Sequence, residues 1–214
     1  MLINLRNALM TGKRLPYDNE VEYLESTGTQ YINTGVLVSS ALDDAQIDIT
    51  YSSSDNTGDL YLFGGGNTYG TAIQMGLTTH TGYVGVSWGQ VVSVRGAYQK
   101  DAVTIARMTY NDYSISFGST TKTGSFTATP RTFSERNIYL FRINRSSGGI
   151  NSNKPVRIYA FKISRNGVAI IDYIPVRKGT TGYLYDRVSG QLFGNAGTGA
   201  FGYGNDLPLG TLAN

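Results

Sequence analysis

The sequence predicts an all-β protein built as a sandwich of two antiparallel sheets. Apolar and polar residues alternate cleanly from Ala45 to Tyr51, which is typical of a strand with one buried face. Strand-like segments then recur about every ten residues with no convincing helix between them, as in a sandwich or jelly roll. The composition agrees, because 27 Gly, 16 Tyr and only 5 Pro among 214 residues suit short strands joined by tight turns.

The predicted strands follow one another along the middle of the chain. Two tight hairpins are expected, at Asn111-Asp112 and at Asn166-Gly167, because both pairs suit a type I′ turn. Gly-rich runs at 64–66 and 146–149 are expected to be loops within one domain. After the strand at 45–51, the expected strands are 59–64, 71–77, 83–88, 91–98, 102–110, 113–118, 122–128, 137–143, 155–164 and 168–176.

The N-terminus carries a different pattern. Leu2, Leu5 and Leu9 stand at helical spacing, with Ile3 beside them. A helix this short is marginal in water and needs a surface to dock on. The alternatives are a strap across its own sandwich, a docking or oligomerisation peptide, and disorder. The expected organisation is a docking segment at 1–18, a sandwich at 19–204 and a C-terminal tail at 205–214.

Composition excludes several kinds of site and partner. The chain has no Cys, so it has neither disulfides nor thiolate metal sites, and its single His, His80, excludes a site with two imidazoles. The net charge is +3. The segment from Arg131 to Arg187 contains eleven Lys and Arg residues and only three acidic residues. This is too sparse for a nucleic-acid surface, and a solvated strand face is the preferred interpretation. No apolar run is long enough for a membrane helix, and Arg6 interrupts the only stretch that could start a signal peptide.

Two stretches near the ends of the chain carry a family resemblance. The first is Val21-Glu-Tyr-Leu-Glu-Ser-Thr-Gly-Thr-Gln-Tyr-Ile-Asn-Thr-Gly35. The second runs from Arg157-Ile-Tyr-Ala-Phe-Lys-Ile-Ser-Arg-Asn-Gly167 through Gly182-Tyr-Leu-Tyr-Asp186 to Phe193-Gly-Asn-Ala-Gly-Thr-Gly-Ala-Phe201. Together they resemble the concanavalin A-like (LamG-type) jelly-roll domains of gut bacteria, their prophages and phages.

The resemblance implies a jelly-roll sandwich with one concave sheet. Relatives are described as carbohydrate-binding proteins or as parts of phage tails, fibres and capsid appendages, so the family supplies a fold more firmly than a function. The two end stretches are expected to be turns that open and close one sandwich, with Tyr31, Tyr183 and Phe193 as packing anchors.

The residues give little support to catalysis. Glucanases on this fold carry paired carboxylates on one strand in a Glu-x-Asp-x-(x)-Glu pattern. Here Glu20 and Glu22 are the nearest approach, at the start of the domain, and a structural or solvated role is the preferred interpretation. His80 lies in a predicted turn without partners, and the Gly run at 64–66 is not followed by the residues of a phosphate loop.

The binding candidates are aromatic and amide side chains near one loop. Flat aromatic rings stack on sugar C–H groups while amides bind the hydroxyls. The candidates are Trp88, Tyr69, Asn67 and Tyr83, although Trp88 could equally belong to the core with Val84 and Val86.

A metal site is a weaker hypothesis. Asp55, Asn56 and Asp59 could form a Ca²⁺ loop, because closely spaced oxygen ligands around a glycine turn suit that ion. The alternative is a plain β-turn, and no other cofactor is expected.

The preferred function is a non-enzymatic bacteriophage appendage: a head fibre, decoration protein or tail adhesin. The docking segment would bind other virion proteins or build a homo-oligomer such as a trimer, while the sandwich binds cell-surface or mucosal glycans. The alternatives are a carbohydrate-binding module on a bacterial cell surface, a glycoside hydrolase with atypical carboxylates, and a capsid component without a ligand.

Overall fold

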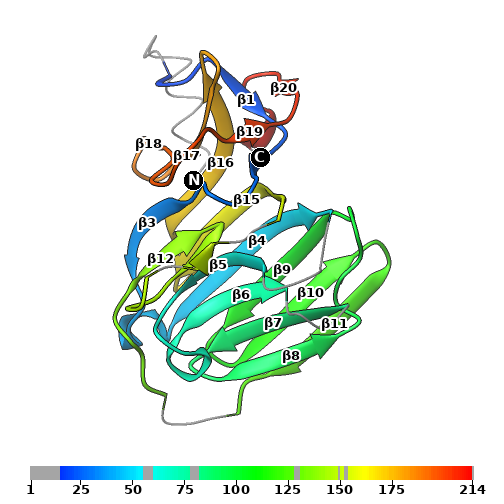
Figure 1. The fold of residues 1–214 in the computed structure, drawn as a ribbon, viewed down its shortest axis with the longest axis vertical. Coiled ribbons are helices and arrows are strands. Elements are labelled where there is room, and N and C mark those ends of the chain that lie inside the picture. The colour runs from blue at the N-terminus through cyan, green and yellow to red at the C-terminus, as the bar shows by residue number, and fades with distance from the viewer. Residues whose placement is uncertain are drawn as a thin grey trace.

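The computed structural model is a sandwich of two β-sheets, and the predicted all-β jelly-roll architecture is confirmed (Figure 1). It describes residues 15–54, 60–77, 82–127, 131–148, 150–151 and 154–213. Three short 3-10 turns, Ser40–Leu42, Tyr69–Thr71 and Thr211–Ala213, are the only helical elements among these residues. None of the helices described is long and apolar enough to cross a membrane.

The larger sheet has 12 strands. Its strands are β1 (Asn19–Val21), β2 (Leu24–Ser26), β4 (Ala45–Ser53), β9 (Thr104–Thr109), β10 (Asp112–Phe117), β11 (Thr120–Ser125), β15 (Val156–Arg165), β16 (Val168–Lys178), β17 (Thr181–Asp186), β18 (Leu192–Phe193), β19 (Gly202–Tyr203) and β20 (Asp206–Leu207). Its main path runs β11-β10-β9-β4-β15-β16-β1-β20, so the long hairpin β15–β16 links the body of the sandwich to the strands near both chain ends.

The smaller sheet has 8 strands and forms the second layer. Its strands are β3 (Ile32–Leu37), β5 (Leu60–Gly65), β6 (Ile73–Leu77), β7 (Tyr83–Trp88), β8 (Val91–Arg95), β12 (Asn137–Leu140), β13 (Arg142–Asn144) and β14 (Ile150–Asn151). The order β14-β13-β5-β6-β7-β8 is antiparallel except for the parallel pair β13–β5. In Figure 1, β5 to β8 lie across the face of β4 and β9 to β11.

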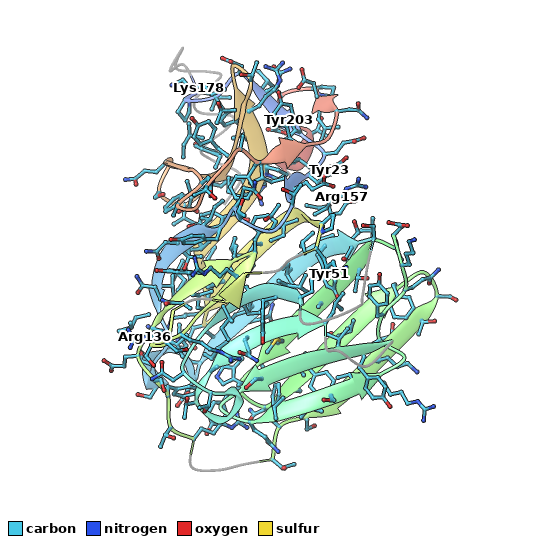
Figure 2. All side chains as sticks on the ribbon, viewed as in Figure 1. Tyr23, Tyr51, Arg136, Arg157, Lys178 and Tyr203 are labelled. Atoms are coloured by element: carbon cyan, nitrogen blue, oxygen red, sulfur yellow. The ribbon has the colours of Figure 1, made fainter. Side chains whose placement is uncertain are left out.

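The main core lies between the two sheets and follows the alternation in the sequence. On β4, Ile47, Ile49 and Tyr51 point inward, while Gln46 and Asp48 point to the outer face. Across the sandwich, β7 contributes apolar side chains to the same cluster. Figure 2 shows Tyr51 within the sandwich. Each fully buried apolar side chain of this kind contributes about 1.5–3 kcal/mol to folding.

A second, smaller apolar cluster is centred on β16 and β17, strands that lie in the upper part of Figure 1. Val176 and Ile174 of β16 pack there against Tyr17 and Tyr185. Residues near both ends of the described chain also pack on this cluster, and they are Leu15 and Leu212. The segment at 15–18 is therefore part of the folded body, and Asp18 Oδ2 accepts a hydrogen bond from the Gly179 amide at 2.7 Å.

Within the predicted C-terminal tail, 205–214, the described residues 205–213 also contact the fold. β20 pairs with β1, and the fully buried Glu20 carboxylate accepts hydrogen bonds from the amides of Gly210 and Leu212 at 2.9 and 2.8 Å. The Leu212 carbonyl in turn accepts a hydrogen bond from Arg187. The N-terminal strand and the last described residues are thus held together through one carboxylate.

The two end stretches bind each other directly. Thr29 Oγ1 donates to the Thr198 carbonyl at 2.9 Å, and the Ala196 amide donates to the Tyr31 carbonyl at 2.8 Å. Both stretches contain strands as well as turns, because β2 and β3 lie in the first and β17 and β18 in the second. β2 and β18 are too short to show alternation, and apolar and polar residues do not alternate in the six residues of β3 or of β17, so sequence periodicity missed all four.

The predicted packing anchors contact three different neighbours. Phe193 packs against Tyr173 in the main core with the ring centroids 4.9 Å apart. Tyr31 stacks on Tyr139 at 5.0 Å, and Tyr183 packs on the smaller cluster. The end stretches therefore anchor both apolar clusters.

Of the two predicted hairpins, one has the expected turn. Asn166 and Gly167 have φ angles of 49° and 77°, as a type I′ turn requires. The second predicted hairpin also forms, because β9 pairs antiparallel with β10, but its turn is not type I′, since neither Asn111 nor Asp112 has a positive φ. Instead, Thr109 Oγ1 accepts hydrogen bonds from both of their amides, which stabilises a turn without left-handed residues. The expected strand at 137–143 is also split, because Phe141 has φ 64°.

Candidate functional site

The structure assigns Trp88 to the core. Its side chain is 0% exposed, and it points inward from β7 with Val84 and Val86. The hypothesis that Trp88 is a sugar-stacking platform is therefore wrong, because no face of the indole reaches solvent.

The other sugar candidates do not form one site with Trp88. Tyr83 is half-buried at the start of β7, where strand alternation places it on the face opposite Trp88. Asn67 Oδ1 accepts a hydrogen bond from the Ser146 amide at 2.9 Å, so it ties two loops together. Tyr69 begins the second 3-10 turn, and its side chain lies outside the described part.

Several other predicted residues fall outside the described ranges. These are the Ca²⁺ candidates Asp55, Asn56 and Asp59, the docking residues Leu2, Ile3, Leu5 and Leu9, and His80. Within the described ranges, no group of three or more His, Cys, Asp or Glu could hold a metal ion.

The glutamates near the N-terminus are engaged in structural contacts. Glu22 accepts hydrogen bonds from the Asn205 backbone and side-chain amides, both at 3.2 Å. Glu25 forms an ion pair with Arg157 at 2.5 Å, and the guanidinium of Arg157 lies over the Tyr23 ring (Figure 2). Together with the buried Glu20, these contacts support the structural interpretation over a catalytic pair.

Much of the positive charge between Arg131 and Arg187 is also paired. The ion pairs in this region join Arg157 to Glu25, Arg165 to Asp44, Arg177 to Asp206 and Arg187 to Asp172. These arginines belong to a mixed-charge strand surface.

A polar hollow on the outer face of the larger sheet is the best candidate site in the described part of the chain. It has a volume of about 440 Å³ and lies where β4 begins, between the β15–β16 turn and the β9–β10 turn. We call it the polar hollow. It is lined by Asp43, Asp44, Ala45, Gln46, Asp48, Arg107, Thr109, Tyr110, Asn111, Lys162, Ser164, Asn166 and Gly167.

The floor of the polar hollow is a hydrogen-bonded row across neighbouring strands. Asp48 on β4 pairs in register with Arg107 on β9 and with Lys162 on β15. Arg107 Nε donates to Asp48 Oδ1 and Gln46 Nε2 donates to Asp48 Oδ2, each at 2.7 Å. Both carboxylate oxygens of Asp48 are therefore fixed in place, which orients the groups around them.

One rim of the polar hollow is held by an ion pair between Asp44, which directly precedes β4, and Arg165, which ends β15. Arg165 donates to both oxygens of Asp44, at 2.7 and 3.1 Å, and Asn166 Nδ2 donates to Asp44 Oδ2 at 2.9 Å. These hydrogen bonds, that of Arg165 above all, hold the pKa of Asp44 below its usual value. The type I′ turn thus contributes directly to the wall of the hollow.

Two opposite charges in the polar hollow, Asp43 and Lys162, make no direct polar contact with the described residues, and the charge of Arg131 acts on Asp43. Within the described part of the chain, neither the Asp43 carboxylate nor the Lys162 ammonium group makes a hydrogen bond or an ion pair. Partial burial raises the pKa of Asp43; Arg131 opposes this effect, and the neighbouring Asp44 adds to it. Both groups are available to a ligand.

The aromatic contribution to the hollow is small. Tyr110 lies on the rim, but the Arg131 guanidinium covers its ring at 3.8 Å from the centroid. Arg131 also donates hydrogen bonds to the carbonyls of Tyr110 and Phe126. The hollow therefore presents hydrogen-bonding groups rather than a flat apolar platform.

Sequence reasoning missed this site, although part of its signal was present. Gln46 and Asp48 are the outward residues of the one strand whose alternation was clear, and Asn166-Gly167 was correctly placed in a turn. The sequence around Gln46 and Asp48 does not show that residues 107 and 162 lie on either side of them, because that depends on the strand order β9-β4-β15.

No protein-family model matches the chain, and no curated protein sequence matches it. Solved structures do resemble it. A putative carbohydrate binding protein from Bacteroides ovatus gives a TM-score of 0.52 at 11% identity, over 87% of this chain and 61% of that one. The IT-sialidase CBM40 of Ruminococcus gnavus, solved with α2,3-sialyllactose, gives 0.43 at 14% identity, over 64% of this chain and 89% of that one. The first likeness shows a shared β-sandwich fold.

Proposed function

We propose that this protein is a non-catalytic, glycan-binding β-sandwich and that a sugar binds in the polar hollow. The observation that carries the proposal is the hollow itself. Its volume suits a small ligand, and fixed donors and acceptors line it. Sugars present many hydroxyl groups, each of which both donates and accepts hydrogen bonds, so Asp, Asn, Gln, Arg and Lys side chains around one hollow match their chemistry. The shared fold with a putative carbohydrate binding protein is consistent with this role.

The contacts of two of the three carboxylates in the hollow support binding rather than hydrolysis. A glycosidase needs one carboxyl group that delivers a proton and a second that attacks or activates water. In the hollow, Asp48 is held by Arg107 and Gln46, and Asp44 is held by Arg165 and Asn166. The hydrogen bonds from Arg165 hold the pKa of Asp44 below its usual value, so that carboxyl group is a poor proton donor.

A matched pair of variants tests the proposal. Asp48→Asn removes the charge at the centre of the hollow floor, and Asp206→Asn removes a similarly ion-paired carboxylate that bonds to Arg177 elsewhere. We expect the full chain to bind glycans on an array. Asp48→Asn should weaken binding at least about tenfold, because a fixed charge-assisted acceptor is lost, and Asp206→Asn should not change it.

Two results would contradict this proposal. One is glycan binding that is equal in the wild type and in Asp48→Asn. The other is hydrolysis of a bound oligosaccharide by the wild type, which would favour the glycoside hydrolase alternative.

For the biological setting, we propose an appendage of a bacteriophage particle, with residues 1–14 as the part that binds other virion proteins or builds a homo-oligomer. The family resemblance supports this setting. The folded contacts of residues 15–18 place the boundary for a deletion at residue 14. We expect mass spectrometry to find the full chain in purified particles and to lose it when residues 1–14 are deleted. Presence on a bacterial surface, with none in particles, would favour the cell-surface module.

A further inference from the structure

We infer that the sugar in the polar hollow is one end of an oligosaccharide, whose chain continues along the outer face of the larger sheet to a second contact at Tyr159 and Tyr23. The inference rests on the proposed function, because it assumes that the hollow binds a glycan. It goes further in assigning the length class of that glycan and the tyrosines that bind its far end.

The strand register connects the hollow to the tyrosines along one face. On β4, the core residues alternate with Asp48, Thr50 and Ser52, so these three point to the outer face. Their register partners on β15 are Lys162, Ala160 and Arg157. With a rise of about 3.3 Å per residue, Asp48 and Ser52 lie roughly 13 Å apart. A ligand that contacts both ends of this path must therefore be longer than one sugar ring.

The surface between the two ends of the path is low and open. We call it the outer strip, and it consists of Thr50, Ala160 and Ile105, which is the register partner of Thr50 on β9. Thr50 and Ala160 are half-buried and have small side chains, so they keep the strip close to the backbone. Ile105 is 59% exposed and adds apolar surface along one side. A sugar chain presents C–H groups as well as hydroxyls, so it can lie across such a surface.

Tyr159 lies at the far end of the outer strip. It stands where the register between β4 and β15 shifts, between the core residue Ile158 and the outward Ala160. The hydroxyl groups of Tyr159 and of the outward Ser52 form a hydrogen bond at 3.1 Å, so the tyrosine side chain is also on the outer face. This bond holds the half-buried ring against the end of β4.

Tyr23 and its neighbours hold this ring in place from the other side. The rings of Tyr23 and Tyr159 pack edge to face with their centroids 5.5 Å apart. The Arg157 guanidinium lies over the Tyr23 ring at 4.5 Å and is itself ion-paired with Glu25 (Figure 2). Because Arg157 takes one face of Tyr23, we assign the main stacking contact to Tyr159. Rings fixed before the ligand arrives lose little freedom on binding, and they supply the aromatic surface that the hollow lacks.

Polar groups beside the tyrosines suit the hydroxyl groups of a stacked sugar. A second hollow, of about 10 Å³, lies next to Arg157, and its walls include Ser52, Ser54 and Asp101. It has room for roughly one water molecule or one hydroxyl group. Hydrogen-bonding groups are thus present at both ends of the path, with the low outer strip between them.

The experiment measures how affinity depends on glycan length. The probes are the array glycan that binds the full chain most tightly and its fragments, shortened one sugar at a time to the monosaccharide. We expect the wild-type affinity in calorimetric titrations to rise by at least about tenfold with length and then to level off, because the stacking contact is made only by chains that reach Tyr159.

Two variants on the path and one matched control test the assignment. Tyr159→Ala should lower the affinity for the longest glycan by about tenfold and leave the shortest binding fragment unchanged. Ala160→Phe, which fills the outer strip, should have the same selective effect without removing a ring. Tyr139→Ala is the control, since Tyr139 is also half-buried and stacks on a tyrosine, Tyr31, that lies under an arginine, but on the smaller sheet. It should not change affinity at any length.

The outcomes separate this inference from the proposed function. If the wild type binds the monosaccharide as tightly as the longest glycan, or if Ala160→Phe binds every length as the wild type does, the inference is overturned while glycan binding in the hollow stands. Absence of binding to any glycan overturns the proposed function and the inference with it. Thermal unfolding of each variant checks that the fold is intact, and Ala160→Phe decides the matter if Tyr159→Ala does not fold.

Discussion

Trp88 shows how one residue can suggest opposite roles. It is the only tryptophan, and tryptophan is a good surface for sugars, yet its place on the inward face of β7 determines its role. The indole Nε1 has no hydrogen-bond partner among the described residues, which is a cost that its apolar burial outweighs.

Truncation of this side chain should therefore affect stability and not binding. We expect Trp88→Ala to lower the free energy of unfolding by about 3–5 kcal/mol, because it leaves a large cavity in the core. Trp88→Phe should cost less, since it keeps most of the packing and removes the unpaired N–H group. Urea unfolding measures both changes. Equal glycan affinity in Trp88→Phe and the wild type is expected, and a selective loss of binding with unchanged stability would contradict the core role.

Asp44 gives a prediction about pH. Its pKa is lowered in the folded protein, chiefly by the hydrogen bonds from Arg165, so its contribution to stability is present above the usual Asp pKa of about 3.9. The contribution is lost as the pH falls through the lowered folded value. We expect Asp44→Asn to reduce the melting temperature slightly at pH 7 and to match the wild type near pH 2. A difference that stays constant between these two values would contradict the ion-pair explanation.

At the scale of elements, the meeting of the two end stretches depends on a close approach of backbone. A Cβ atom at Gly197 would overlap the carbonyl oxygen of Thr29, which accepts a hydrogen bond from the Thr198 amide at 3.3 Å. Only glycine allows the two segments to lie this close.

This contact predicts different effects for two alanine substitutions. We expect Gly197→Ala to destabilise the protein by about 1–3 kcal/mol, because the clash forces the two stretches apart. Gly70→Ala is the control, since a Cβ at Gly70 would have nothing within 4 Å and its φ is not in the left-handed region. Differential scanning calorimetry compares them. Equal melting temperatures for the two variants would show that the end stretches are not constrained in this way.

At the scale of the whole molecule, the smaller apolar cluster connects the chain ends to the sandwich. The buried Glu20 carboxylate is central to it, because it accepts from two backbone amides near the C-terminus and Tyr17 Oη lies 3.4 Å away. Burial, together with the nearby Glu20 charge, raises the pKa of Tyr17, which keeps that hydroxyl protonated as a donor. The C-terminal residues are thus part of the folded body.

Removal of residues 205–214 should for this reason destabilise the protein. We expect a loss on the order of 3 kcal/mol, because hydrogen bonds to a charged group contribute about 1.5–3 kcal/mol each and their effects are not additive. Denaturant unfolding of the shortened chain measures it. Glu20→Gln, which keeps the shape and one acceptor, should cause a smaller loss. A shortened chain as stable as the wild type would contradict the role of Glu20.

The sequence by itself determined the local features of this protein. The alternation in 45–51 places Ile47 and Ile49 in the core and Asp48 outside, and Asn166-Gly167 specifies its own turn. These features depend on side-chain direction and backbone preference within a few residues, which is why they can be predicted from the chain alone.

The tertiary structure decided everything that joins distant residues. Asp44 and Arg165 lie 121 positions apart, and Glu20 and Leu212 lie 192 apart, yet each pair is in contact. Likewise, Trp88 is core because the inward face of β7 packs into the cluster between the two sheets, and the polar hollow exists because β9 and β15 flank β4. Strand order sets these neighbours, and periodicity carries no information about it.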